Sequence, residues 1–158
     1  MHHNAELITS FYAAFQRRDH AAMARCYARD VVFQDEVFAV QGWRAAAMWH
    51  MLCSRATDLR IEARNISAGE AVGSATWDAW YTFKATGRSV HNHVRASFVF
   101  KEDLIARHTD RFGFWRWAGQ ALGPKGWILG WTPQLRSAVR AASARALESF
   151  IEDHQLGE

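Results

Sequence analysis

The chain has 158 residues, of which 49% are hydrophobic and 22% charged, and its formal net charge is +3. This composition is typical of one soluble globular domain that can bury a continuous core, and it argues against disorder. The arginines stand singly between apolar residues and form no basic run, so we expect no nucleic-acid partner. No apolar run approaches the length of a membrane span, so we expect no membrane partner and a cytoplasmic location.

The N-terminal third of the chain has the apolar spacing of helices. Leu7, Ile8, Phe11 and Phe15 recur with a period near 3.6. Three helices are predicted, with a short strand before the third: 6–16, 20–28, strand 31–35, and 42–54. Asp19 is expected to cap the second helix.

After Thr57 the apolar period changes to 2, which indicates strands. Four strands are predicted, at 60–68, 75–84, 90–101 and 104–114. Short turns at Thr86-Gly87-Arg88 and Glu102-Asp103 join the last three, so the sheet is expected to be antiparallel. Helices followed by strands indicate an α+β class, with the helices gathered on one face of the sheet.

The C-terminal part is unusually rich in tryptophan, which contributes eight residues to the whole chain. We predict a short helix at 114–124, an apolar loop at 126–131 and a final helix from Thr132 to about His154. The chain 1–158 is thus one domain, with a core at 5–114 and a Trp-rich extension with the C-terminal helix at 115–154. Four tryptophans of the extension either close a pocket or form a dimer contact: Trp115, Trp117, Trp127 and Trp131.

Three polar residues interrupt the apolar rows of the last two strands, namely Asn92, His108 and Asp110. Because His108 and Asp110 are two positions apart on one strand, they share a face and can act on one substrate or water. They are candidates for an acid/base pair near neutral pH. The alternative is a buried hydrogen-bonded pair that holds strands together. Asn92 either donates to a ligand carbonyl or satisfies a buried backbone group.

The order of elements, the run Phe11-Tyr12-Ala13-Ala14-Phe15 with Asp19, and the segment from Tyr27 to Asp35 carry a resemblance over about residues 5–114. The chain resembles the nuclear transport factor 2-like superfamily, and within it the SnoaL-like and ketosteroid isomerase-like branch. This resemblance implies a cone-shaped, cystatin-like roll, in which N-terminal helices pack on a strongly curved antiparallel sheet and enclose an apolar pocket. The superfamily houses enzymes, binding proteins and assembly modules, so it implies the fold more strongly than a function.

The resemblance also assigns roles to individual positions. Asp35 falls where the isomerases carry their carboxylate base, although it can equally cap the loop that follows. Phe11 and Ala96 occupy the positions of the two isomerase oxyanion donors, so the chain is not expected to be a classical ketosteroid isomerase. Asp110 falls where SnoaL-like polyketide cyclases and some hydroxylases place an acid/base aspartate.

The remaining site predictions concern ligand and partners. Besides Asn92, six residues are expected to line the pocket: Trp77, Tyr81, Met48, Trp49, Phe98 and Trp115. The histidines do not have zinc-ligand spacing, so we expect no metal and no cofactor. A homodimer is expected through the sheet face that bears His91, His93 and Trp80.

Two functions follow from these observations. The first is a cofactor-free acid/base enzyme of isomerase, cyclase or hydrolase type, acting on a small carbonyl-containing or polycyclic substrate through Asp110 and His108, with Asp35 assisting. The second is a non-catalytic module that binds a small apolar molecule or mediates dimeric assembly.

Overall fold

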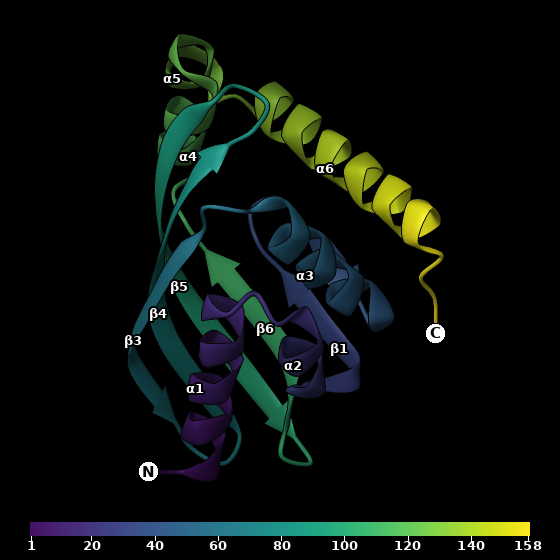
Figure 1. The fold of residues 1–158 in the computed structure, drawn as a ribbon. Coiled ribbons are helices and arrows are strands. Elements are labelled where there is room, and N and C mark those ends of the chain that lie inside the picture. The colour runs from purple at the N-terminus through teal and green to yellow at the C-terminus, as the bar shows by residue number, and fades with distance from the viewer.

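A computed structural model describes all of residues 1–158 and has six helices and six strands. The elements are, in chain order, α1 (His3–Gln16), α2 (His20–Arg25), β1 (Tyr27–Gln34), β2 (Ala39–Gln41), α3 (Trp43–Arg55), β3 (Arg60–Ala68), β4 (Val72–Phe83), β5 (Arg88–Lys101), β6 (Leu104–Arg111), α4 (Phe114–Leu122), α5 (Pro124–Leu129) and α6 (Pro133–His154). The predicted α+β class is confirmed. Figure 1 shows α1, α2 and α3 on one side of the sheet, with α6 running down the same side from the end that carries α4 and α5.

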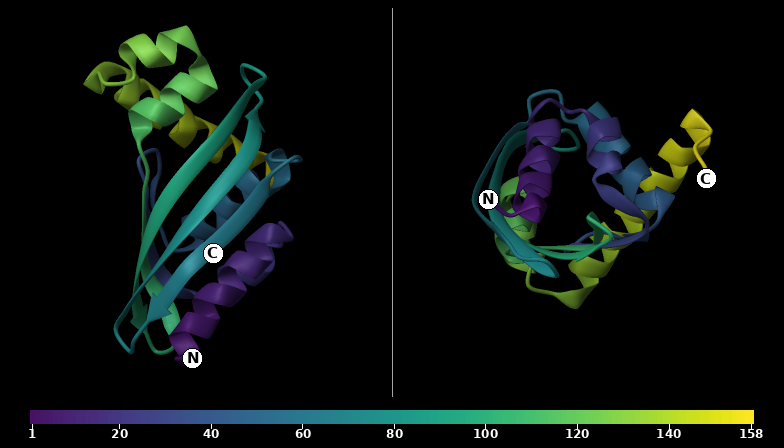
Figure 2. Two further views of the ribbon diagram at one scale, coloured as in Figure 1. Left: turned by 90° about the vertical axis from the view of Figure 1, so that its left-hand side faces the viewer. Right: turned by 90° about the horizontal axis from the view of Figure 1, so that it is seen from below.

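All six strands belong to one sheet, in the order β2-β1-β6-β5-β4-β3. The sheet curls around the N-terminal helices without closing, as Figure 2 shows in the view from below. The four strands predicted after Thr57 pair antiparallel as expected, and the sheet is mixed because β1 pairs with β6 in parallel. Tight turns fix the direction only of the strands that they join, and no turn joins β1 to β6.

Bulges and turns give the sheet its curvature. The register between β3 and β4 shifts between Arg64 and Ser67, where Asn65 has a φ of 55°. Such an extra residue bends a strand and increases its twist. Glu102 and Asp103 both have positive φ, at 53° and 62°, as the two central residues of a tight hairpin turn require. The predicted turn between β5 and β6 is thereby confirmed.

The helices close the concave side of the sheet. Ile8, Phe11 and Phe15 of α1 are almost fully buried in one cluster with Met48 of α3 and Phe98 of β5. The Asp19 side chain accepts from the backbone N–H of Ala22 and caps α2 as predicted. The helix α2 ends at Arg25, three residues earlier than predicted, because the backbone from Tyr27 already belongs to β1.

The C-terminal extension adds a helical hairpin and a long helix. Residues 124–129 form α5, not the predicted loop, because Pro124 suits the first position of a helix and the backbone can continue from there. Thr132 caps α6 and accepts from Leu135 N–H. None of the six helices combines the length and the apolar character that crossing a membrane requires.

Candidate functional site

A chain of hydrogen bonds runs through the interior between β1, α3, β6 and β4. The Trp49 indole N–H donates to Tyr27 Oη over 2.9 Å, and Tyr27 Oη lies 2.8 Å from His108 Nδ1. His108 Nε2 lies 2.9 Å from Asp110 Oδ1, which also accepts from Trp77 Nε1 at 3.4 Å. Every contact in this chain is satisfied when Tyr27 donates to Nδ1 and His108 carries its proton on Nε2.

Aromatic rings enclose the His108 imidazole, which has no exposed surface. The rings of Phe11, Phe33 and Phe98 lie with their centres 5.4, 5.0 and 4.4 Å from that of His108. The predicted pairing of His108 with Asp110 is present, and it is buried together with the predicted residues Trp49, Trp77, Met48 and Phe98. This arrangement holds β6 against the rest of the core.

Two polar atoms beside this chain have no partner. The Tyr12 hydroxyl is buried and makes no hydrogen bond, and Asp110 makes hydrogen bonds only through Oδ1. Burial, followed by the nearby Asp110 charge, raises the pKa of Tyr12 well above its ordinary value. Tyr12 was not among the predicted site residues, although the run Phe11-Tyr12 on a helix places both residues near the buried stripe.

Asp35 lies where β1 ends, beside the end of β6. Its Oδ1 accepts from the backbone N–H groups of Val37 at 2.7 Å and Phe38 at 2.6 Å, while Oδ2 makes no hydrogen bond. Burial, opposed in part by these two hydrogen bonds and assisted by the Asp110 charge, raises the pKa of Asp35 to about 7. Asp35 therefore does cap its loop, and it also presents a carboxyl oxygen that titrates near neutrality.

Tyr81 and Asn92 bring two free donors to the same end of the sheet, which we call the α4 end. Tyr81 Oη accepts from the Trp117 indole of α4 at 2.8 Å, so its own proton has no acceptor. Burial, opposed by this hydrogen bond and assisted by the Asp35 charge, raises the pKa of Tyr81. Asn92 is half-buried on the inner row of β5 opposite Ala79, and its side chain makes no hydrogen bond.

Trp115 does not join the predicted site. It is exposed on α4, and its indole donates to the backbone carbonyl of Trp127. On the outer face of the sheet, the predicted dimer residues His91 and His93 contact Asp78.

Asp78 is a buried carboxylate that was not among the predicted site residues. Burial raises its pKa, but hydrogen bonds from Arg64, His93 and His91 outweigh this and lower it to about 2. The alternation of inward and outward residues along β4 could not show that Asp78 is buried, because its three partners come from the neighbouring strands β3 and β5.

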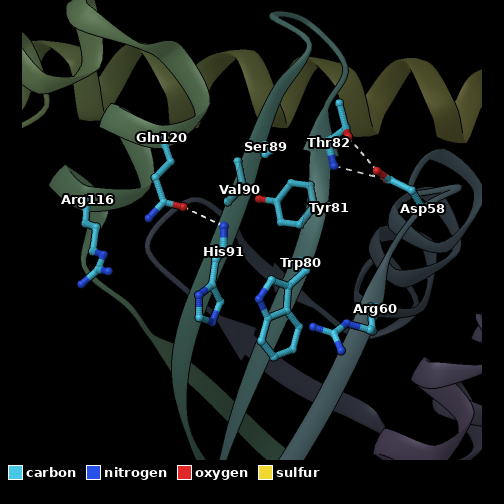
Figure 3. Close-up of a pocket in the computed structure, with 10 residues that line it drawn as sticks. All are labelled: Asp58, Arg60, Trp80, Tyr81, Thr82, Ser89, Val90, His91, Arg116 and Gln120. Atoms are coloured by element: carbon cyan, nitrogen blue, oxygen red, sulfur yellow. Dashed lines mark hydrogen bonds between the residues drawn. The ribbon is translucent and has the colours of Figure 1, made fainter.

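A groove of about 530 Å³ lies on the outer face beside α4 (Figure 3). Its walls include the stacked side chains of Arg60, Trp80 and His91, and it reaches Tyr81. A second hollow of about 910 Å³ lies between the start of β1 and the start of α3. Neither is lined by Asp35, His108 or Asp110.

A curled sheet closed by N-terminal helices, with an apolar interior that holds a few ionisable groups, defines a class of small conical α+β domains. The chain belongs to the SnoaL-like domain family, whose sequence profile matches residues 8–108. The predicted resemblance to this branch of the nuclear transport factor 2-like superfamily is thereby confirmed. Among curated proteins, none matches the chain.

Solved structures confirm the fold. A proposed polyketide cyclase from Xanthomonas campestris pv. campestris is 21% identical with a TM-score of 0.63, over 75% of this chain and 96% of that one. AclR, a proposed hydroxylase from Streptomyces galilaeus, is 21% identical with a TM-score of 0.63, over 85% of this chain and 97% of that one. A proposed ketosteroid isomerase from Kribbella flavida is 12% identical with a TM-score of 0.57, over 70% of this chain and 78% of that one.

Proposed function

We propose that this protein binds a small carbonyl-containing or polycyclic molecule at the α4 end of its interior and transfers a proton on it without a cofactor. The observation that carries the proposal is Asp35, a half-buried carboxyl with one unbonded oxygen and a pKa of about 7. Such a group is partly ionised at neutral pH and basic enough to accept a proton. Similarity to a proposed polyketide cyclase supports the substrate class.

The reaction begins when Asp35 Oδ2 takes a proton from a carbon next to a carbonyl group. The electron pair of the broken C–H bond becomes an enolate, and Asp35 becomes a neutral carboxylic acid. In an isomerisation the acid returns the proton to another carbon of the substrate. In a ring closure the enolate carbon attacks a second carbonyl, and the acid protonates the resulting alkoxide. Protons and charge balance in both outcomes.

Tyr81 and Asn92 are the proposed donors to the enolate oxygen. The Tyr81 O–H has no acceptor because Trp117 occupies only a lone pair of its oxygen, and the Asn92 amide is equally free. Donors aimed at a developing oxyanion contribute about 3–4 kcal/mol each to a lowered barrier. They would take over the role of the isomerase donors, whose positions hold Phe11 and Ala96 here.

Asp110 is a second proposed acid/base group. It is favoured by its unbonded Oδ2 and by the partnerless hydroxyl of Tyr12 nearby. Against it stands the complete enclosure of His108, the predicted other half of the pair. Parallel Asp35→Asn and Asp110→Asn variants separate the two assignments, since each retains a side-chain oxygen that accepts hydrogen bonds.

Non-catalytic ligand binding is the second candidate function, and the closed hydrogen-bond chain from Trp49 to Trp77 favours it. This chain leaves His108 no free nitrogen with which to move a proton. Native mass spectrometry of protein purified from cells would then show a retained small molecule that the protein leaves unchanged.

Binding of 2-naphthol, a planar hydroxyarene whose anion resembles an enolate, tests the proposed site. We expect fluorescence titration to show binding that Tyr81→Phe weakens by about tenfold, the loss of one hydrogen bond to the naphthol oxygen. Ser89→Ala is the matched control, because Ser89 lines the outer groove. Tyr81 also borders that groove, so weaker binding by Ser89→Ala, whatever the effect of Tyr81→Phe, would move the site to the outer groove and contradict the proposal.

A further inference from the structure

Five large apolar side chains are exposed together at one end of the molecule. They come from α4, α5 and the turn before α6: Trp115 (48% exposed), Trp127 (41%), Ile128 (67%), Leu129 (41%) and Trp131 (75%). We call them the tip surface. Figure 1 places α5 at the extreme end of the molecule, away from both chain termini. Exposed apolar surface of this extent on a small domain marks a site of interaction.

The tip surface is held rigidly. A side chain on Gly126 would meet the Ala118 carbonyl oxygen at 1.8 Å, and one on Gly119 would meet the Trp127 ring at 2.2 Å. The backbones of α4 and α5 therefore touch, and only glycine allows this contact. The rings of Trp115 and Trp127 also pack edge to face, with their centres 4.8 Å apart. The exposure of these side chains is thus built into a packed hairpin.

The segment that carries the tip surface has charges of one sign. No acidic residue occurs between Asp110 and Glu148, while that interval contains Lys125, two positions before Trp127, and Arg116, which follows Trp115 and borders the outer groove. Neither Arg116 nor Lys125 takes part in an ion pair. A surface of tryptophan, isoleucine and leucine with unpaired cations has the composition that binds the interface of an anionic bilayer.

We propose that the tip surface inserts into the headgroup region of a membrane that contains anionic lipid. The protein is then a peripheral membrane protein, docked by its α4–α5 end. A peripheral contact needs no membrane-spanning run, which was the only ground for expecting no membrane partner. A second copy of the chain is the poorer occupant, because a symmetric contact between two tips brings Arg116 and Lys125 of both copies together, whereas anionic lipid neutralises them.

Co-sedimentation of the full chain with vesicles tests the proposal. The probes are vesicles of phosphatidylcholine with roughly one-third phosphatidylserine, and vesicles of phosphatidylcholine alone. We expect binding to the anionic vesicles that weakens with added salt, and a loss of about tenfold or more in Ile128→Ser/Trp131→Ser. Neither residue makes a side-chain hydrogen bond, so the double variant keeps the fold.

Val72→Ser/Val99→Ser is the matched control, since these two residues are also exposed and pair across β4 and β5. It should bind the anionic vesicles as the wild type does. Absence of binding to both kinds of vesicle overturns the proposal, as does an equal loss in the control. A dimer in light scattering that Ile128→Ser/Trp131→Ser dissociates, with no vesicle binding, would assign the tip surface to a second copy instead.

Discussion

Asp35→Asn removes a carboxyl whose pKa is raised to about 7. The folded protein holds this proton up to about pH 7, whereas an ordinary aspartate releases it near 3.8. Because the folded state binds the proton more tightly, the stabilisation linked to Asp35 is complete below the unfolded pKa and is lost as the pH rises through the folded pKa. The linkage gives a loss of roughly 2.5 kcal/mol between about pH 5 and pH 8.

Urea unfolding of the wild type and Asp35→Asn at several pH values measures this loss. Groups that do not interact with Asp35 contribute equally to both proteins, so the difference between their unfolding free energies reports Asp35 together with its coupling to Asp110. We expect that difference to move by roughly 2.5 kcal/mol in favour of the variant as the pH rises from about 5 to 8. The amide oxygen that the variant carries in place of the carboxylate can still accept from Val37 and Phe38, so the loop keeps its turn.

Asp58→Asn is the control. The hydroxyl and backbone N–H of Thr82 lower the Asp58 pKa, so this carboxyl stays ionised throughout the same interval. Parallel pH profiles for the wild type and Asp35→Asn would show that Asp35 does not titrate near neutrality. The assignment of Asp35 as the base would then be wrong.

Three further predictions concern stability. Asp78→Asn should destabilise the fold by roughly 1–3 kcal/mol in urea unfolding at neutral pH, because it leaves Arg64 without its charge partner. The wild type should lose this stabilisation as the pH falls from 3.8 towards about 2. A difference in unfolding free energy between the wild type and Asp78→Asn that stays the same at about pH 2 would contradict this. Gly126→Ala should lower stability by roughly 2–4 kcal/mol, measured by thermal unfolding against Gly157→Ala, since its Cβ meets a carbonyl oxygen. Burial and the neighbouring histidines lower the pKa of His50, so the folded state loses stability as the pH falls below about 6.5. His50→Gln should lose less stability over this range, and a pH dependence of unfolding equal to that of the wild type would refute this.

The predicted homodimer through the outer sheet face has a direct measurement. Light scattering at micromolar concentration should give twice the mass of the chain, and Trp80→Ser should shift the protein towards a monomer. Trp80 stacks between Arg60 and His91 on this face. A monomeric wild type would contradict the prediction.

Periodicity was enough to predict most of the fold. The period of 2 located the inner rows of β5 and β6, and the structure places His108 and Asp110 among the buried residues as that alternation requires. The turn at Glu102 and Asp103 followed from local chemistry alone. What periodicity could not show is pairing between strands far apart in the chain, and the parallel contact of β1 with β6 is such a pairing.

The same difference between local and long-range contacts decided which contacts of the site could be predicted. Two residues apart on one strand, His108 and Asp110 could be predicted to meet. Tyr27, which completes their hydrogen-bond chain, is 81 positions from His108, and no local pattern joins them. The freedom of the Tyr81 hydroxyl likewise depends on Trp117, which comes from a helix beyond the predicted core.

Deuterium incorporation into 2-tetralone, a bicyclic ketone with acidic protons next to its carbonyl, tests the proposed proton transfer most directly. In deuterated buffer at neutral pH, proton NMR follows the exchange with the protein present. We predict that the wild type and Asp58→Asn accelerate the exchange above the buffer rate and that Asp35→Asn does not. Equal acceleration by Asp35→Asn, or no acceleration by the wild type, would contradict the account.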